Sequence, residues 1–168
     1  MLEVFRNFNM IDGIHNEPLA NSYLIMDSQN GNIVEVGKIQ EEKWPEEMSP
    51  EQIHDLDGKW IIPGLIDCHV HLMRDGSPDP DSILKNDPVE LVALKALHSA
   101  QRHLAIGITT VRDNGSIGLS VLSTKKAIQM GLFQGPRILT SGSPLIMTGG
   151  HFHVGGIEVD GINEVTKA

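Results

Sequence analysis

The stretch WIIPGLIDCHVHL, residues 60–72, is apolar over its first seven positions apart from one Pro-Gly break, and then carries an acid, a cysteine and two histidines. Side chains of an extended chain alternate between faces, so His69 and His71 share one face of this predicted strand and Cys68 and Val70 the other. Two imidazoles on one face can converge on a metal ion, although a solvated pair of histidines at a strand end gives the same pattern. The apolar run itself is typical of a strand in a sheet that is buried on both faces.

The composition is that of one globular domain with an ordinary core, with 168 residues of which 40% are hydrophobic and 21% charged. Thirteen basic residues stand against 22 acidic ones, a formal charge of -9, and no cluster of lysine or arginine could follow a phosphate backbone. No apolar stretch approaches the length of about 20 residues that a membrane-spanning helix needs, and the start of the chain lacks the pattern of a signal peptide. We therefore expect no nucleic-acid partner, no membrane partner and a cytoplasmic location.

Cys68 is the only cysteine, so an intrachain disulfide is excluded. Its place on the face opposite the histidines predicts a small apolar residue packed under a helix layer. A nucleophilic cysteine needs a neighbouring base, and the predicted alternation points the histidines away from this thiol.

Residues 1–59 are predicted to form a small β-rich domain and linker. The segments SYLIM (22–26) and NIVEVG (32–37) are apolar and β-branched, and DSQNGN (27–32) between them contains Asn-Gly, a strong hairpin signal. The stretch QEEKWPEEMSPEQIHDLDG (40–58) collects acids and prolines, which predicts a solvated connection with a short helical turn at SPEQI.

Residues 60–168 alternate between strand and helix patterns. One helix is predicted with Asp87 as its N-cap, Pro88 as its first residue and a capping box completed by Glu90, and Gly107 ends it. Its apolar positions follow helical spacing and predict a face packed on the sheet: Val89, Ala93, Ala96, Leu97, Ala100 and Leu104. A second strand (GITTVRD), a second helix near residues 119–130 and a third strand (PRILTSG) follow. This βαβ rhythm predicts an α/β fold with a parallel sheet.

Polar residues follow each of the three predicted strands, where ligands bind in parallel α/β sheets. His69 and His71 close the first strand, Arg112 and Asp113 close the second, and the glycine-rich SGSPLIMTGGHFHVGG (141–156) follows the third. This common placement favours the metal interpretation of the histidine pair over the solvated one.

Several of these motifs resemble those of the amidohydrolase superfamily. LDGKWIIPGLIDCHVHL (56–72) is similar to the first-strand signature of that superfamily, and GITTVRDNG (107–115) to its second strand. GPRILTSGSPLIMTGGHFH (135–153) resembles the third strand and loop of the branch that contains imidazolonepropionase and Xaa-Pro dipeptidase (prolidase)-like enzymes. MIDGIHNE (10–17) and NGNIVEVG (30–37) fit the small β domain that precedes the barrel there. The resemblance covers nearly the whole chain.

The resemblance implies a TIM barrel with two divalent metal ions, usually zinc, and hydrolysis of an amide or peptide-like C–N bond. His69 and His71 match the pair that binds the more buried metal. The family pattern also uses a bridging lysine, two further histidines and an aspartate as proton shuttle after strands four to eight, and none of these lies in this sequence. About 109 residues follow residue 59, whereas a full barrel takes about 250. We therefore expect only the first three βα units, as an incomplete barrel over residues 60–168.

The same resemblance assigns His151 to substrate binding from the loop after the third strand, although a glycine-rich loop is often only a turn. His153 completes a second His-x-His pair. An alternative is therefore a closed, structural four-histidine zinc site made of His69, His71, His151 and His153.

Two other polar residues at strand ends have alternative roles. Asp67 could accept a hydrogen bond from a ligand histidine or from a neighbouring backbone group. Arg112 could hold a substrate carboxylate or form an ion pair with Asp113, and we expect the ion pair.

Two functions remain as hypotheses. The first is a metal-dependent amidohydrolase, in one version dipeptidase-like, with a small amide or dipeptide as substrate and this chain as its N-terminal part. The second is a non-catalytic metal-binding or assembly module. In both cases we expect the 168-residue chain alone to lack catalytic competence and to self-associate or pair with the missing barrel segment, because its sheet edge is left open.

Overall fold

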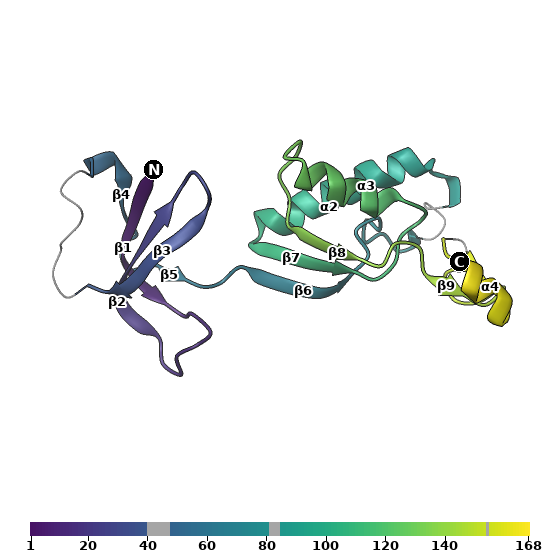
Figure 1. The fold of residues 1–168 in the computed structure, drawn as a ribbon, viewed down its shortest axis with the longest axis horizontal. Coiled ribbons are helices and arrows are strands. Elements are labelled where there is room, and N and C mark those ends of the chain that lie inside the picture. Colours follow the sequence, from purple (N-terminus) through teal and green to yellow (C-terminus); the bar gives the residue numbers. More distant parts are fainter. Residues whose placement is uncertain (40–47, 81–84, 154) are drawn as a thin grey trace. The chain divides into compact units, whose positions relative to one another are not determined.

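The computed structural model describes residues 1–39, 48–80, 85–153 and 155–168. It divides into two compact units, Met1–Pro63 and Gly64–Ala168 (Figure 1). The first eight residues of the predicted acidic connection, 40–47, lie outside the described residues. Within the described part of the chain, no helix is both long enough and apolar enough to cross a bilayer.

The first unit is built around one long strand, β1, which pairs with neighbours on both of its edges. The hairpin partner β2 runs antiparallel to it, and β3 is antiparallel to β2, while β4 and β5 add to the other edge of β1 in parallel. A 3-10 turn precedes β4, where SPEQI predicted a helical turn. The bounds are β1 Leu2–Met10, β2 Leu19–Asp27, β3 Asn32–Lys38, η1 Pro50–Gln52, β4 Ile53–Asp55 and β5 Trp60–Ile61.

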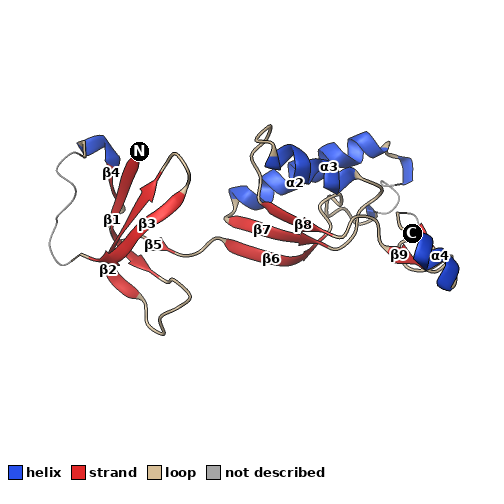
Figure 2. Ribbon diagram, viewed as in Figure 1, coloured by secondary structure: helices blue, strands red, loops and turns tan. Residues whose placement is uncertain are grey.

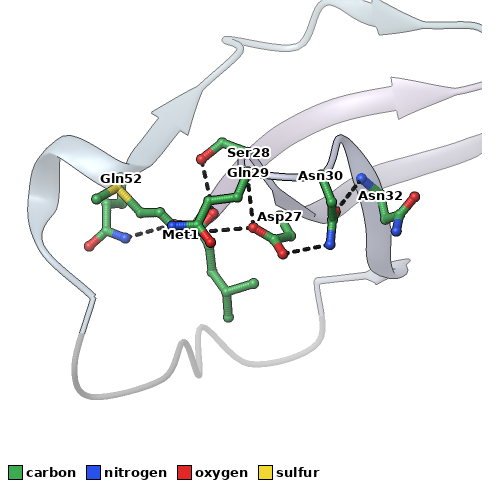
Figure 3. A network of polar contacts seen from close by, with 8 residues as sticks. Met1, Asp27, Ser28, Gln29, Asn30, Asn32 and Gln52 are labelled. Atoms are coloured by element: carbon green, nitrogen blue, oxygen red, sulfur yellow. Dashed lines mark hydrogen bonds and ion pairs between the residues drawn. The ribbon is translucent and has the colours of Figure 1, made fainter.

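The Asn-Gly signal correctly predicts the hairpin between β2 and β3, and Asp27 organises its turn. The Asp27 carboxylate accepts hydrogen bonds from the backbone N–H of Gln29 (3.1 Å) and from the side chain of Asn30 (2.8 Å). It also pairs with the terminal ammonium of Met1 at 2.9 Å, and the Ser28 hydroxyl donates to the Met1 carbonyl (Figure 3). One carboxylate therefore ties the start of β1 to the hairpin.

The boundary between the two units lies after Pro63, four residues beyond the predicted boundary at residue 59. Trp60 and Ile61 do not begin the buried strand, because they pair with Asn9 and Met10 of β1. The Pro-Gly break thus divides one apolar stretch between two sheets.

The second unit contains a parallel sheet in the order β6-β7-β8, which confirms the predicted three strands (Figure 2). Two helices, α2 and α3, connect these strands, and a small parallel pair, β9 and β10, follows with a short last helix. The bounds are β6 Leu65–Val70, α2 Val89–Ala105, β7 Ile108–Asp113, α3 Ser120–Gln129, β8 Arg137–Thr140, β9 Leu145–Ile146, β10 Ile157–Glu158 and α4 Ile162–Lys167.

The N-cap and the first residue of helix α2 each lie one residue later than predicted. Pro88 occupies the N-cap position with an extended backbone (ψ 148°), and its carbonyl accepts the first helical hydrogen bonds. The Asp87 side chain makes no cap and instead contacts the Lys95 ammonium at 2.5 Å. The predicted capping box is therefore wrong, because Pro88 stays extended and moves the helix start past the reach of Asp87.

The core of the second unit lies between the sheet and one face of the two helices. Its buried residues come from β7, β8, both helices and the chain just after β6: Leu72, Ala96, Ala100, Val111, Val121 and Ile138. Ala96 and Ala100 belong to the predicted apolar face of α2, but Val89 is exposed and Val92 is buried in its place. The buried side of α2 is thus rotated slightly from the predicted one.

The sheet keeps apolar surface exposed in the described structure. Leu139, which alternates with buried Ile138, is 51% exposed, and Ile66 in the edge strand β6 is 66% exposed. Cys68 is exposed too, so its predicted burial under a helix layer is wrong. The reason is that α2 packs on β7 and α3 on β8, whereas β6 lies at the edge of the sheet.

Candidate metal-binding site

The two histidines of the first motif come together at the carboxyl end of β6. His69 is the last but one residue of that strand, and His71 follows directly after it. Their ring centroids lie 5.4 Å apart with an interplanar angle of 76°. The predicted convergence of the two imidazoles is therefore observed, and His69 is exposed while His71 is half-buried.

A hydrogen bond fixes which nitrogen of His71 is available to a ligand. The Nδ1 atom lies 3.1 Å from the carbonyl oxygen of Gly115, and a carbonyl can only accept, so Nδ1 carries the hydrogen. The neutral ring then has its lone pair on Nε2. A metal-ligating histidine is typically oriented in this way, with its other ring N–H bound to a carbonyl or carboxylate.

Asp113, the last residue of β7, is a fully buried carboxylate beside this pair. It accepts hydrogen bonds from the backbone N–H of Leu72 (2.9 Å) and of Gly115 (3.3 Å), and from the Thr140 hydroxyl (3.2 Å). Burial raises the pKa of the Asp113 carboxyl because the charged form loses hydration, while these hydrogen bonds act in the opposite direction. Asp113 thus connects the exits of β6, β7 and β8.

The third predicted site residue, His151, lies in an exposed turn between β9 and β10. Its neighbour Phe152, with φ 66°, packs against Met73 and Val92, and the guanidinium carbon of Arg74 lies 5.3 Å from the centre of the Phe152 ring. This anchor holds the turn against the chain that follows β6. The role of His151 in substrate binding stays a prediction.

The described residues include no group of three or more histidine, cysteine or acidic side chains arranged to hold a metal ion. The alternative of a four-histidine site is therefore wrong for this structure, since His151 and His153 do not join His69 and His71. A tetrahedral zinc site needs three or four protein ligands. The His69–His71 pair fits part of such a site, with the correct donor type and a free Nε2 on His71.

The structure decides between the alternatives for Asp67 and excludes the ion pair that was expected for Arg112. Asp67 accepts a hydrogen bond from the backbone N–H of His69 at 3.1 Å, which is the backbone role. Arg112 is exposed and no ion pair joins it to buried Asp113, because adjacent side chains of a strand point to opposite faces. The expected Arg112–Asp113 pair is wrong.

Sequence reasoning missed the importance of two residues at this end of the sheet. Asp113 lies two residues after the apolar Val111 and so on the same face of the strand, which already predicts a buried carboxylate. Phe152 is the one aromatic side chain in a loop rich in glycine, which is a signal for an anchor.

Helix α2 carries two further histidines, His98 and His103, which do not belong to the His69–His71 pair. The His103 Nδ1 atom donates to the carbonyl oxygen of Ser99, four residues earlier, at 2.8 Å. His98 is exposed on α2 and is not part of the pair at the end of β6. Its substitution removes one imidazole without touching that pair, so His98 is the control for substitutions of the site histidines.

The parallel sheet and the histidine pair at its carboxyl edge define an α/β protein with a candidate metal site where such sheets bind ligands. The chain belongs to the amidohydrolase family, whose sequence profile matches residues 60–168. Members of this superfamily are generally metal-dependent, and the relatives place the chain in the imidazolonepropionase and prolidase-like branch.

Among the relatives, an imidazolonepropionase of Paraburkholderia phymatum is 30% identical over 111 residues, which are 62% of this chain and 21% of that protein. A second, from Bacillus mycoides, is 29% identical over 115 residues, 54% of this chain and 26% of that protein. The chain thus spans about a quarter of the curated relatives that it matches.

Solved structures agree over a larger part of this chain. The crystal structure of an amidohydrolase superposes with a TM-score of 0.79 at 31% identity and covers 99% of this chain, which spans 43% of that one. A Xaa-Pro dipeptidase with bound methionine in its active site gives a TM-score of 0.73 at 27% identity, covering 90% of this chain and 36% of its own. The α/β fold of this protein therefore corresponds to part of the amidohydrolase structures.

Proposed function

We propose that this chain is the N-terminal part of a metal-dependent hydrolase that cleaves amide or peptide-like C–N bonds in small molecules. The observation that carries the proposal is the His69–His71 pair, 5.4 Å apart at the carboxyl end of β6, with the His71 Nδ1–H bound to the Gly115 carbonyl. Family membership and the names of the relatives support it. The first three βα units of an incomplete TIM barrel and a cytoplasmic location are further parts of the proposal.

In this proposal His69 and His71 are two ligands of a divalent ion, with zinc as the favoured metal because neutral imidazole is a good zinc donor. A bound divalent ion of this kind lowers the pKa of a water molecule toward 7 and so supplies hydroxide near neutral pH. Other residues of this chain orient the two proposed ligands. Gly115 fixes the tautomer of His71, and Asp67 holds the backbone at His69.

Small N-acyl amino acids or dipeptides are the proposed substrates. One similar solved structure is a prolidase complexed with N-methylphosphonate-L-proline, with a TM-score of 0.76 at 30% identity. His151 is proposed to contact such a substrate, because Phe152 anchors its turn beside the chain that leaves β6.

The metal site is tested by zinc binding to the purified chain, measured by competition with a chromophoric chelator. We expect weak binding by the wild-type chain, none by the double variant His69→Ala/His71→Ala, and wild-type binding by the control His98→Ala. Unchanged zinc binding in the double variant would contradict the assignment.

The hydrolytic function is tested on the polypeptide as its gene encodes it, with a panel of N-acyl amino acids and Xaa-Pro dipeptides. We expect turnover that His71→Ala removes and His98→Ala leaves intact. Zinc bound to His69 and His71 without any turnover would instead support a non-catalytic metal-binding module. The small number of ligands in the described residues favours this second candidate.

A further inference from the structure

We propose that Asp113 is a positioning residue that sets the orientation and tautomer of the His71 imidazole through the backbone of Gly115. The inference rests on the metal role proposed above for His71, and it assigns a task to a carboxylate that the proposed function does not otherwise use.

The contacts form a closed path from Asp113 to His71. One carboxylate oxygen of Asp113, Oδ1, accepts from the Gly115 N–H, and the carbonyl of the same Gly115 accepts from His71 Nδ1. The other oxygen, Oδ2, accepts from the N–H of Leu72, the residue that follows His71. Asp113 therefore holds the backbone on both sides of the hydrogen bond that orients the ring.

Gly115 is suited to this link because its conformation leaves little freedom. It is buried and has φ 144°, a conformation that residues with a side chain rarely adopt. A Cβ atom at this position would lie 3.3 Å from Cγ of Pro144, so the carbonyl of Gly115 is held in a tightly packed place. The N–H and the carbonyl of Gly115 belong to adjoining peptide groups, so Asp113 fixes the first of these groups, and the Ser116 N–H, bound to the Gly142 carbonyl, fixes the second.

The exit of β8 completes the support of Asp113. The Thr140 hydroxyl donates to Asp113 Oδ1 and accepts from the N–H of Gly142 at 3.1 Å. The Asp113 carbonyl accepts from the N–H of Ser141, and the Gly142 carbonyl accepts from the N–H of Ser116. The carboxylate is thus fully engaged inside the protein, and its geometry is set by two neighbouring strands.

The chemical consequence concerns the two nitrogens of His71. While Gly115 accepts from Nδ1, the neutral ring is held in the Nδ1–H tautomer and Nε2 has the lone pair that a metal requires. If the Gly115 carbonyl turns away, the ring can place its hydrogen on Nε2 instead, which blocks that nitrogen as a ligand.

The test is the tautomer of His71 in the metal-free 168-residue chain, read from long-range ¹H–¹⁵N NMR correlations of the imidazole at a pH above the ordinary histidine pKa of about 6.5. We expect one tautomer, Nδ1–H, in the wild type and a mixture in Asp113→Asn. The amide of the variant must place its NH₂ group against the backbone N–H of either Gly115 or Leu72, so one of these two hydrogen bonds is lost. Asp87→Asn, a carboxylate contacting Lys95, is the control and should keep the wild-type tautomer.

Zinc affinity provides a second readout, and we expect Asp113→Asn to lower it about 10- to 100-fold, as for other residues that orient metal ligands. A folded Asp113→Asn chain in which His71 keeps the Nδ1–H tautomer would overturn the inference. If that variant does not fold, Asp113→Glu carries the test, because the longer side chain keeps the charge but displaces the carboxylate from the N–H groups of Gly115 and Leu72. An unchanged tautomer in folded Asp113→Glu would overturn the inference equally. A tautomer shift in a chain that binds no zinc would support the positioning role and contradict the proposed metal site.

Discussion

Replacing Gly64 by alanine tests the close packing at the start of β6. An added Cβ would lie 2.1 Å from Oγ1, 2.3 Å from Cγ2 and 2.7 Å from Cβ of Thr109, the second residue of β7. All three distances are far below van der Waals contact, and rotation of the threonine side chain cannot relieve the clash with its Cβ. Overpacking of this kind costs about 1–3 kcal/mol. For a unit of this size, each kcal/mol lowers the melting temperature by roughly 4–8 °C.

The unfolding of each unit can be followed by a different signal. Helices α2 and α3 belong to the second unit, so the helical circular dichroism band reports on it. Trp60 belongs to β5 of the first unit, so its fluorescence, recorded in a Trp44→Phe background, reports on that unit. We expect Gly64→Ala to lower the melting temperature seen by circular dichroism much more than the one seen by fluorescence.

A matched control and a double-mutant cycle make the reasoning refutable. At Gly135, an added Cβ meets mainly the far end of the Ile128 side chain, which can rotate away, so Gly135→Ala should cost less. In a Thr109→Gly background the clash is gone, and the coupling between the two sites should reach about 1–3 kcal/mol. A wild-type melting temperature for Gly64→Ala, or a loss that Thr109→Gly does not relieve, would refute the argument.

Three further predictions can be checked on the same chain. The 168-residue chain alone should show no hydrolysis of N-acyl amino acids or Xaa-Pro dipeptides even with excess zinc, and any turnover that His69→Ala removes would contradict this. The open edges of β6 and β8 should cause self-association, visible as a concentration-dependent mass in light scattering; a monomer at all concentrations would argue against it. The pKa of Asp27 should lie below the ordinary value of about 3.9, because the Met1 ammonium and the Gln29 N–H stabilise its charged form. Its contribution to stability is therefore present above that value and lost as the pH falls through the lowered pKa, and NMR titration of the carboxyl measures the shift directly.

Local sequence patterns predicted the elements whose structure depends on near neighbours. The Asn-Gly hairpin, the two helices and the alternation that joins His69 to His71 follow from residues a few positions apart. The prediction that the buried strand begins at Trp60 was wrong, because the pairing of this residue depends on a distant segment. Trp60 looks like the start of a buried strand, but its partner is Asn9, and no pattern within the apolar stretch identifies that pairing.

In the candidate site, too, features set by neighbouring residues were predictable and features set by distant residues were not. The histidine pair was predictable because both residues lie on one strand, whereas the hydrogen bond from His71 to Gly115 joins residues 44 positions apart. The wrong pairing of Arg112 with Asp113 came from matching charges along the sequence without applying the alternation of side chains. That alternation, with Val111 in the core, would have predicted the buried carboxylate.

The arrangement of β1 also has a consequence for the order of events during synthesis on the ribosome. One edge of β1 pairs with β2 within the first 27 residues, but the described partners of the other edge are Ile53–Asp55 and Trp60–Ile61, which are made later. Because synthesis proceeds at about 5–20 residues per second, the nascent chain carries an open strand edge for several seconds. The segment that closes this edge ends at Ile61, and only two residues separate it from Gly64. Completion of the first sheet therefore coincides with the emergence of the strand that carries His69.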